Sequence, residues 1–206
     1  LEVYEGETLG LVGESGCGKT TLARTIMRLD PPRSGSIVFD GTDLAALPVR
    51  RMRPWRRSIQ IVFQDPYSSL NPRQTVLDIV TEGLRTHGLI AASNREAEAA
   101  RVLREVGMDA DALHRYPHEF SGGQRQRISV ARAMAIEPRL LLCDEAVSAL
   151  DVSIQAQVIE LLISLRERHG LSYIFISHDL SVVRHISHRI AVMYLGRIVE
   201  QGATDD

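Results

Sequence analysis

The chain has 206 residues, of which 44% are hydrophobic and 24% are charged, as is ordinary for one globular domain with a sizeable core. Its formal net charge of −2 excludes a global positive field that would draw the protein to nucleic acid or acidic lipid. The sequence has no apolar run near the roughly 20 residues that a spanning helix needs, and no signal peptide opens it. Its two cysteines, Cys17 and Cys143, suit a reduced cytosolic protein better than a disulfide framework.

Short apolar runs rich in β-branched residues recur along the chain, and flanking Gly, Pro, Asp and Ser mark their ends. This pattern predicts strands buried on both faces. They cover Thr8–Val12, Ser36–Phe39, Ile59–Phe63, Leu140–Cys143, Tyr173–Ile176 and Ile190–Tyr194. Helical patterns lie between several of them, notably over Lys19–Leu29 and Ile154–Arg168. The alternation predicts an α/β fold with a mainly parallel sheet.

The middle of the chain has a different pattern. From Thr75 to about Glu137 it is helical and poor in strands, with Ala-rich and charged spacing over Arg95–Val106. Ser121 is placed to be the N-cap of a further helix. We therefore expect a helical subdomain, residues 75–137, inserted between two parts of a sheet-containing core, residues 1–74 and 138–206.

A glycine-rich segment follows the first predicted strand. Gly13–Thr20 fits G-x-x-x-x-G-K-[ST] at every fixed position, with a strand before it and an amphipathic helix after it. Glycines let backbone N–H groups converge on phosphate oxygens, and the helix N-terminus adds a favourable partial charge. The motif predicts ATP binding, with Lys19 at the β and γ phosphates and the Thr20 hydroxyl on Mg²⁺. The alternative, a purely structural turn, is disfavoured by this context.

Cys17 lies inside the glycine-rich loop, next to a helix N-terminus. That environment can lower the pKa of a thiol and make it reactive, which is one interpretation of this residue. The simpler interpretation is that position 17 is a variable position where a small side chain fits.

Two carboxylates, Asp144 and Glu145, follow the predicted strand Leu140–Cys143. Successive strand residues point in opposite directions, so Asp144 and Glu145 can do different jobs. Asp144 is placed to hold Mg²⁺, and Glu145 is placed to orient and deprotonate an attacking water. A solvated acidic strand end is the alternative for this segment by itself.

A histidine and a glutamine end two further strands. His178 follows a strand that should neighbour the one ending at Asp144, where it would face the γ-phosphate. Gln64 follows Ile59–Phe63, and its amide can both ligate Mg²⁺ and hydrogen-bond water. Residue chemistry leaves both assignments open, because a lone His is usually structural or on the surface.

The segment Phe120-Ser121-Gly122-Gly123-Gln124 closely resembles the signature of ABC ATPases, and the whole chain follows that family's motif order. Gly13–Thr20 resembles Walker A, Gln64 the Q-loop, Leu140–Glu145 Walker B, Ser148–Asp151 the D-loop and His178 the switch histidine. The resemblance implies Glu145, His178 and Gln64 as catalytic residues and Thr20, Gln64 and Asp144 as metal ligands. It implies nucleotide contacts from Gly13, Glu14, Ser15, Gly16, Cys17, Gly18, Lys19, Thr20, Thr21, Ser121, Gly122, Gly123, Gln124 and Asp151.

The resemblance also implies a partner. In similar proteins two ATPase domains pack head-to-tail, and each ATP lies between one Walker A and the partner's signature. Ser121, Gly122 and Gly123 would therefore bind γ-phosphate in trans, at the N-terminus of their helix. The partner domain could make either a homodimer or a heterodimer.

Three segments resemble a narrower group, the oligopeptide, dipeptide and nickel importers. They are Gln64–Arg73, Cys143–Ser153 and Gly196–Gly202. Ala146 replaces the proline that is more common across ABC proteins at this position. The resemblance implies transmembrane permease subunits as partners, indirect contact with a solute-binding protein, and a peripheral place on the cytoplasmic face of the cell membrane.

The chain starts at Leu1 and ends within Gly202–Asp206, so we expect a piece that is incomplete at both ends. The family normally stacks adenine on an aromatic residue well upstream of Walker A, and Tyr4 is a poor substitute. We therefore expect weaker nucleotide binding by this piece than by a longer chain.

Two rival functions are consistent with the ABC motifs. One is a soluble ABC ATPase acting in DNA repair or translation, which the compact interval between Walker A and the signature disfavours. The other is a non-catalytic nucleotide sensor, which Glu145 and His178 disfavour. The basic segment Arg50–Arg57 could be a nucleic-acid or lipid patch, but with the net charge near zero we interpret it as solvated and expect no nucleic-acid partner.

Overall fold

The computed structural model describes residues 1–204, except for the side chains of Pro66 and Ser68. Its main sheet has six strands in the order β4-β5-β6-β1-β7-β8. These strands are β1 (Thr8–Val12), β4 (Ile59–Val62), β5 (Leu140–Asp144), β6 (Ser172–Ile176), β7 (Arg189–Tyr194) and β8 (Arg197–Ala203). The first five in the sheet order pair in parallel, and β8 pairs antiparallel with β7. The predicted parallel sheet is confirmed.

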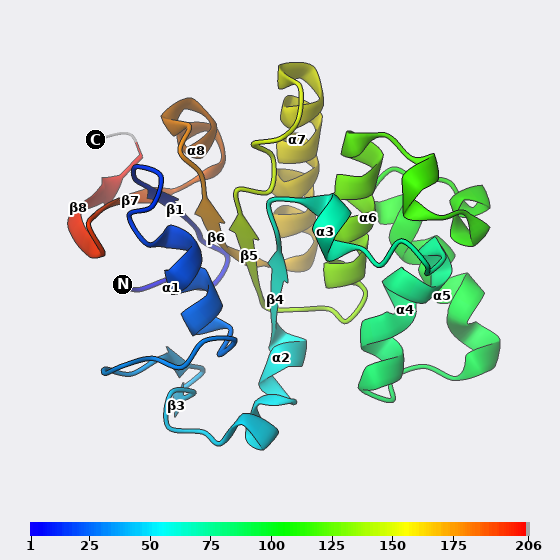
Figure 1. Cartoon of the computed structure of the whole chain (residues 1–206), viewed down its shortest axis with the longest axis horizontal. Helices are drawn as coiled ribbons and strands as arrows, with labels where there is room; N and C mark the ends of the chain where they lie inside the picture. The colour runs from blue at the N-terminus through cyan, green and yellow to red at the C-terminus, as the bar shows by residue number, and fades with distance from the viewer. Residues whose placement is uncertain (205–206) are drawn as a thin grey trace.

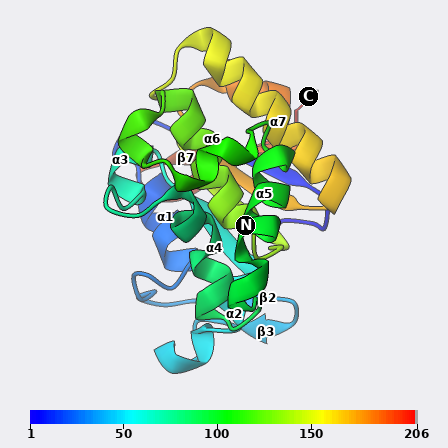
Figure 2. The same cartoon turned by 90° about the vertical axis from the view of Figure 1, so that its right-hand side faces the viewer.

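Helices cover both faces of this sheet (Figures 1 and 2). The α-helices are α1 (Lys19–Ile26), α2 (Trp55–Ser58), α3 (Pro66–Ser69), α4 (Val76–Thr86), α5 (Arg95–Glu105), α6 (Gly122–Met134), α7 (Val152–His169) and α8 (Leu180–Ile186). Short 3₁₀ turns are η1 (Val49–Met52), η2 (Ala92–Asn94), η3 (Ala110–His114) and η4 (Pro117–Glu119). Between β4 and β5 the described chain is helical, as the sequence predicted.

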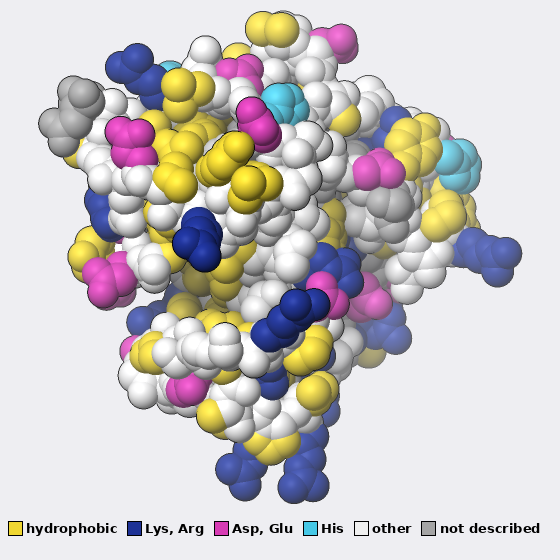
Figure 3. All heavy atoms as spheres, turned by 60° about the vertical axis from the view of Figure 1, so that its left-hand side comes forward, with side chains coloured by type: hydrophobic (Ala, Val, Ile, Leu, Met, Phe, Trp, Pro, Cys, Tyr) yellow, Lys and Arg dark blue, Asp and Glu magenta, His cyan; other side chains and the backbone are white. Residues whose placement is uncertain are grey.

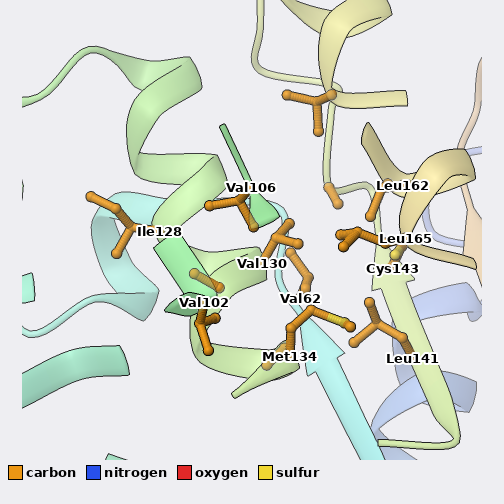
Figure 4. Packing of buried hydrophobic residues seen from close by; sticks show 14 of the residues in the cluster. Val62, Val102, Val106, Ile128, Val130, Met134, Leu141, Cys143, Leu162 and Leu165 are labelled. Carbon is orange, nitrogen blue, oxygen red and sulfur yellow. The ribbon is translucent and has the colours of Figure 1, made fainter. Parts of the chain in front are cut away.

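Strand β5 shows how the two faces of the sheet are packed. Leu140 and Leu142 point into the cluster that includes Ala23 of α1 and Met27, which directly follows that helix. Leu141 and Cys143 point the other way, into the cluster formed by α4 to α8. Figure 4 shows this second cluster, where side chains of β4 and β5 meet those of α6 and α7. Because side chains alternate along a strand, five buried residues in a row must be covered on both sides.

The two helices that frame the middle segment begin at capping residues. Thr75 precedes α4, and its hydroxyl accepts a hydrogen bond from the backbone of Asp78. Ser121 precedes α6 in a capping box: its Oγ accepts from the Gln124 backbone, and the Gln124 side chain accepts from the Ser121 backbone. The predicted N-cap at Ser121 is confirmed.

The expected buried strand Ser36–Phe39 is wrong. Val38–Phe39 forms β2, which pairs antiparallel with β3 (Thr42–Asp43) in a separate two-stranded sheet, and Val38 is 65% exposed. The reason is the turn between them, where Asp40 and Gly41 both have positive φ and fold the chain into a hairpin.

One helix boundary and one strand also differ from the predictions. Helix α1 ends at Ile26 instead of Leu29, because Arg28 adopts a positive φ that leaves the helical conformation. Strand β8 was not predicted as a strand. It is an exposed edge strand, so its sequence lacks the buried apolar run on which the other predictions rested.

The basic segment before β4 lies at one end of the molecule, as Figure 3 shows by the dark blue side chains at the lower end. Arg50, Arg51 and Arg53 are exposed in η1 and just after it. Trp55 anchors the segment by an edge-to-face contact with Phe39, and Arg53 donates a hydrogen bond to the Thr86 carbonyl. None of the helices within residues 1–204 is long and apolar enough to cross a bilayer.

Candidate phosphate-binding site

Four neighbouring strands bring the predicted catalytic and phosphate-binding segments to one edge of the sheet. Strands β4, β5, β6 and β1 are adjacent and parallel, so their carboxyl ends lie at the same edge. Gln64 follows β4, Glu145 follows β5, His178 follows β6, and the glycine-rich loop follows β1. Ligands of open α/β sheets bind outside these carboxyl ends.

The loop between β1 and α1 wraps around the Lys19 side chain. The ammonium of Lys19 donates hydrogen bonds to the carbonyls of Gly13, at 2.7 Å, and Glu14, at 3.0 Å. Gly18 is the N-cap of α1 with a φ of 110°, which a residue with a side chain rarely adopts. Glu14, Ser15, Gly16, Thr20 and Thr21 are exposed. The loop therefore has an open outer side and a cation held at its centre.

The β7–β8 hairpin packs against this loop at Gly13 and Cys17. The Cys17 side chain is 6% exposed, and its carbonyl accepts a hydrogen bond from the Gly196 backbone at 2.8 Å. A Cβ at Gly13 would overlap both the Met193 carbonyl and the Cys17 sulfur. The burial of Cys17 supports the small-side-chain interpretation of this residue and argues against a readily alkylated thiol.

Thr20 and Asp144, two of the predicted Mg²⁺ ligands, are in contact. The Thr20 hydroxyl donates to Asp144 Oδ1 at 3.2 Å. Asp144 is buried, and burial raises the pKa of its carboxyl above the ordinary value, with Glu145 adding to the rise and Thr20 opposing it. A hydroxyl and a carboxylate side by side, facing an open phosphate loop, fit the oxygen ligands that Mg²⁺ takes together with substrate phosphates.

Glu145 and His178 face each other across the ends of β5 and β6. The Nδ1 atom of His178 lies 3.4 Å from the Glu145 carboxylate, whose side chain is 16% exposed while that of His178 is 59% exposed. Glu145 has a φ of 49°, a conformation that residues other than glycine seldom adopt and that is typical of functional sites. Its backbone N–H donates to the Ile176 carbonyl, which ties the turn to β6.

Gln64 reaches the same edge through Ser148, which the sequence analysis placed in the D-loop-like segment without predicting this contact. Its Nε2 donates to the Ser148 hydroxyl at 3.4 Å, and that hydroxyl donates to the Glu145 carbonyl at 2.9 Å. Ser148 therefore connects the exposed Gln64 amide with the turn that carries Glu145. No residue pattern could have indicated this contact, because serine is common in turns.

The predicted signature residues lie apart from the glycine-rich loop of the same chain. Figure 1 shows α6, which Ser121 caps, separated from α1 by the strands of the sheet. Within residues 1–204, no hydrogen bond or ion pair joins Ser121–Gln124 to Gly13–Thr20. The signature packs instead on the start of α7: Gly122 faces Leu150, and a Cβ at Gly123 would overlap Ile154. Asp151 is exposed at this junction, as the N-cap of α7.

The fold and the site define a P-loop nucleotide-binding domain of the ATP-binding cassette type. The chain belongs to the ABC transporter family, whose model matches residues 1–148.

The chain is similar to curated ATP-binding proteins that are named for peptide transport. It is 56% identical over 203 residues to a probable peptide ABC transporter ATP-binding protein of Sinorhizobium fredii, covering 98% of this chain and 58% of that protein. It is 52% identical over 206 residues to a putative peptide import ATP-binding protein of Brucella ovis, covering 100% of this chain and 65% of that protein. The chain therefore spans about three fifths of the length of these relatives.

Solved structures with the same fold are ATP-binding cassettes. The dimeric post-hydrolysis state of the cassette MJ0796, bound to ADP and Pi, matches with a TM-score of 0.89 and 30% identity over 99% of this chain and 88% of that chain. A cassette of Clostridium perfringens described as part of the transporter complex cbiONQ matches with a TM-score of 0.89 and 27% identity, over 100% of this chain and 80% of that chain. The predicted α/β fold of the ABC ATPase type is confirmed.

Proposed function

We propose that the chain is the ATP-binding and ATP-hydrolysing part of a membrane ABC importer for peptides or a related small solute. The observation that carries the proposal is the arrangement at the sheet edge. Glu145 faces His178 at 3.4 Å, next to the Thr20–Asp144 pair and the phosphate loop. This arrangement supplies a base, a metal-ligand pair and a phosphate cradle at one place.

Different residues of the chain bind the phosphates, hold the metal ion and accept the proton during hydrolysis. The loop amides and Lys19 hold the phosphates, and Thr20, Asp144 and Gln64 would hold Mg²⁺, which when bound neutralises phosphate charge. Glu145 accepts a proton from the attacking water while the water oxygen bonds to the γ-phosphorus. The bond between the γ-phosphorus and the oxygen that bridges to the β-phosphate breaks at the same time. His178, held beside Glu145, faces the γ-phosphate. ADP and inorganic phosphate leave.

A second cassette completes the site. Ser121, Gly122, Gly123 and Gln124 would bind the γ-phosphate held by the partner, with Asp151 at the same interface. The exposed capping box of Ser121 and Gln124 supports this role, because a helix N-terminus attracts an anion. The dimeric state of the similar MJ0796 cassette supports it further.

The name of the Brucella ovis relative, a putative peptide import ATP-binding protein, supports an import system. On this proposal the chain divides into a nucleotide-binding core (1–74 and 138–206) and a helical subdomain (75–137). It docks on transmembrane permease subunits at the cytoplasmic face of the membrane, and a solute-binding protein delivers the solute on the other side. The transport complex of the similar Clostridium perfringens cassette is consistent with such partners.

The test uses the full-length subunit. Glu145→Gln should retain ATP binding, lose hydrolysis by roughly 10²- to 10⁴-fold, as expected for removal of a general base, and accumulate as a dimer in ATP. Phosphate release and light scattering measure both effects. Purification from membranes should recover permease subunits. Recovery of ribosomes or DNA in their place, or normal hydrolysis by Glu145→Gln, would overturn the proposal.

A further inference from the structure

The basic segment that precedes β4 projects from one end of the molecule. Figures 1 and 2 both show the cyan chain between β3 and β4, which contains η1 and α2, as the lowest part of the fold. Figure 3 shows Lys and Arg side chains gathered at the same end. Residues 44–64 contain five arginines and no carboxylate, whereas the whole chain has a net charge of −2. The positive charge is therefore local to this end of the molecule.

A folded turn presents these arginines. Met52 of η1 is 2% exposed and belongs to the buried cluster on the α1 face of the sheet. Trp55, at the start of α2, makes an edge-to-face contact with the Phe39 ring. The Leu47 carbonyl, just before η1, accepts a hydrogen bond of 3.1 Å from Arg28. Because these contacts fix the turn to the core, binding at its surface would order little additional backbone.

The exposed arginines of the segment lack a counter-charge. Arg50, Arg51, Arg53 and Arg57 are exposed, and none of them forms an ion pair within residues 1–204. Eight arginines elsewhere in that range do form one. Arg53 donates a hydrogen bond to the Thr86 carbonyl, which is a neutral acceptor. Four cations at this end are therefore not neutralised by the described part of the chain.

A neighbouring histidine shows that these cations act on one region of the surface. His87 directly follows α4, next to the Thr86 carbonyl that Arg53 contacts. Burial lowers the pKa of His87 below its ordinary value, and the positive charges of Arg53 and Arg57 lower it further. Two arginines on either side of Trp55 therefore contribute to the same positive potential. An anionic surface at this end would meet several cations at once.

The turn also exposes an apolar side chain beside its cations. Val49, the first residue of η1, is 66% exposed and directly precedes Arg50 and Arg51. Cations around an exposed apolar residue suit a bilayer interface, where the cations meet anionic headgroups and the apolar group meets the boundary with the acyl chains. An extended peptide is usually bound in a groove or along a sheet edge, whereas this end of the molecule projects outward. The observations therefore favour a membrane surface over an acidic peptide.

We propose that Val49, Arg50, Arg51, Arg53 and Arg57 form a docking surface for the anionic headgroups of a membrane leaflet. We call these five residues the arginine surface. The inference goes beyond the proposed function, in which permease subunits alone attach the chain to the membrane. Each cation adds only a modest attraction to an anionic leaflet, so the arginine surface orients the subunit against the membrane and the permease provides the stable attachment.

The experiment sediments the full-length subunit, without permease subunits, with lipid vesicles. The partition coefficient on vesicles of phosphatidylglycerol and phosphatidylcholine should exceed that on phosphatidylcholine alone by about tenfold or more, and should fall as salt is added. Arg50→Gln combined with Arg51→Gln should lower it about 25-fold, since each cation near an anionic leaflet contributes about fivefold. Arg50→Lys combined with Arg51→Lys keeps both charges and should stay within about threefold of wild type.

Arg184→Gln combined with Arg197→Gln is the matched control. Both residues are exposed, neither forms an ion pair within residues 1–204, and they lie on α8 and β8. The control should lower the partition coefficient by less than about twofold, because charges beyond a Debye length are screened. A loss equal to that of the Arg50 and Arg51 pair would overturn the inference.

Two further results would also contradict the arginine surface as a lipid site. One is equal binding of the wild-type subunit to vesicles with and without phosphatidylglycerol. The other is displacement from the vesicles by polyglutamate or duplex DNA at a lower concentration of charge than that of the lipid, which would assign the surface to an acidic protein or to nucleic acid. Unchanged ATP binding by every variant shows that it is folded. Hydrolysis by the wild-type subunit is measured separately, so a failure of this inference is distinguishable from a failure of the proposed function.

Discussion

The phosphate edge and the signature end of this chain differ in how complete they are. At the phosphate edge, residues from four strands meet within hydrogen-bonding distance, as the Thr20–Asp144 contact of 3.2 Å shows. At the signature end, Ser121 and Gln124 hydrogen-bond to each other, and both are exposed at the N-terminus of their helix. On the proposed function, the first region binds the nucleotide of its own chain, whereas the second meets the nucleotide that a partner cassette brings. Substitutions at the phosphate edge should therefore change ATP binding by the monomer, whereas substitutions at the signature end should change hydrolysis and leave that binding unchanged.

The largest effect on ATP binding is expected from Lys19→Ala. This change removes the only ammonium of the loop, which should weaken ATP binding by the monomer about 10- to 100-fold, the value of a hydrogen bond to a charged group. Equilibrium binding of a fluorescent ATP analogue measures it. Wild-type affinity in the variant would show that the phosphate edge does not act within its own chain.

Ser121→Asp tests the other end of the comparison. Aspartate is as good an N-cap as serine, so α6 should keep its stability, and ATP binding by the monomer should not change. The added negative charge would repel the partner's γ-phosphate and should lower hydrolysis by more than about tenfold. Phosphate release measured at saturating ATP checks this. Hydrolysis at the wild-type rate would mean that the signature does not meet a phosphate.

Gly123→Ala and Gly122→Ala form a matched pair at the junction of α6 with α7. A Cβ at Gly123 would overlap Ile154, whereas one at Gly122 would meet Leu150 at an ordinary 3.6 Å. Gly123→Ala should therefore lower the free energy of unfolding by about 1–3 kcal/mol, the usual cost of overpacking, and Gly122→Ala should not lower it. Urea denaturation compares them. Equal stabilities would contradict the packing of the signature on α7.

The smallest effect concerns the first turn of α4. The hydrogen bond from Arg95, 2.7 Å long, holds the pKa of Asp78 below its ordinary value. A lowered pKa in the folded protein adds stability above the ordinary pKa of Asp, and this is lost as the pH falls through the folded value. Asp78→Asn should remove this part of the pH dependence at acid pH, at a cost of at most about 1 kcal/mol at neutral pH, because the pair is partly exposed. Urea unfolding at several pH values measures it, and Arg95→Gln should behave in the same way.

Much of the phosphate edge could be predicted because its residues are consecutive in sequence or follow buried strands. The strand Thr8–Val12 and the N-cap at Ser121 were predicted at the residues where the structure has them. The strand order then brings Gln64, Asp144 and His178 together. Contacts between distant polar residues could not be predicted in this way. The Gln64–Ser148 hydrogen bond and the packing of Arg125 on Tyr67 depend on how two segments lie in space, which neither periodicity nor spacing encodes.

The packing of Gly13 limits how the glycine-rich loop, Gly13–Thr20, can be redesigned. A Cβ there would meet the carbonyl of Met193, a backbone atom, as well as the sulfur of Cys17. Shortening Cys17 to alanine would clear the second obstacle, but no side-chain replacement at position 193 can clear the first. The first glycine of the loop is therefore required by its neighbouring strand even if no nucleotide ever binds. A search for variants with altered nucleotide preference can leave position 13 out of its library and spend its diversity on Glu14 and Ser15, which face solvent.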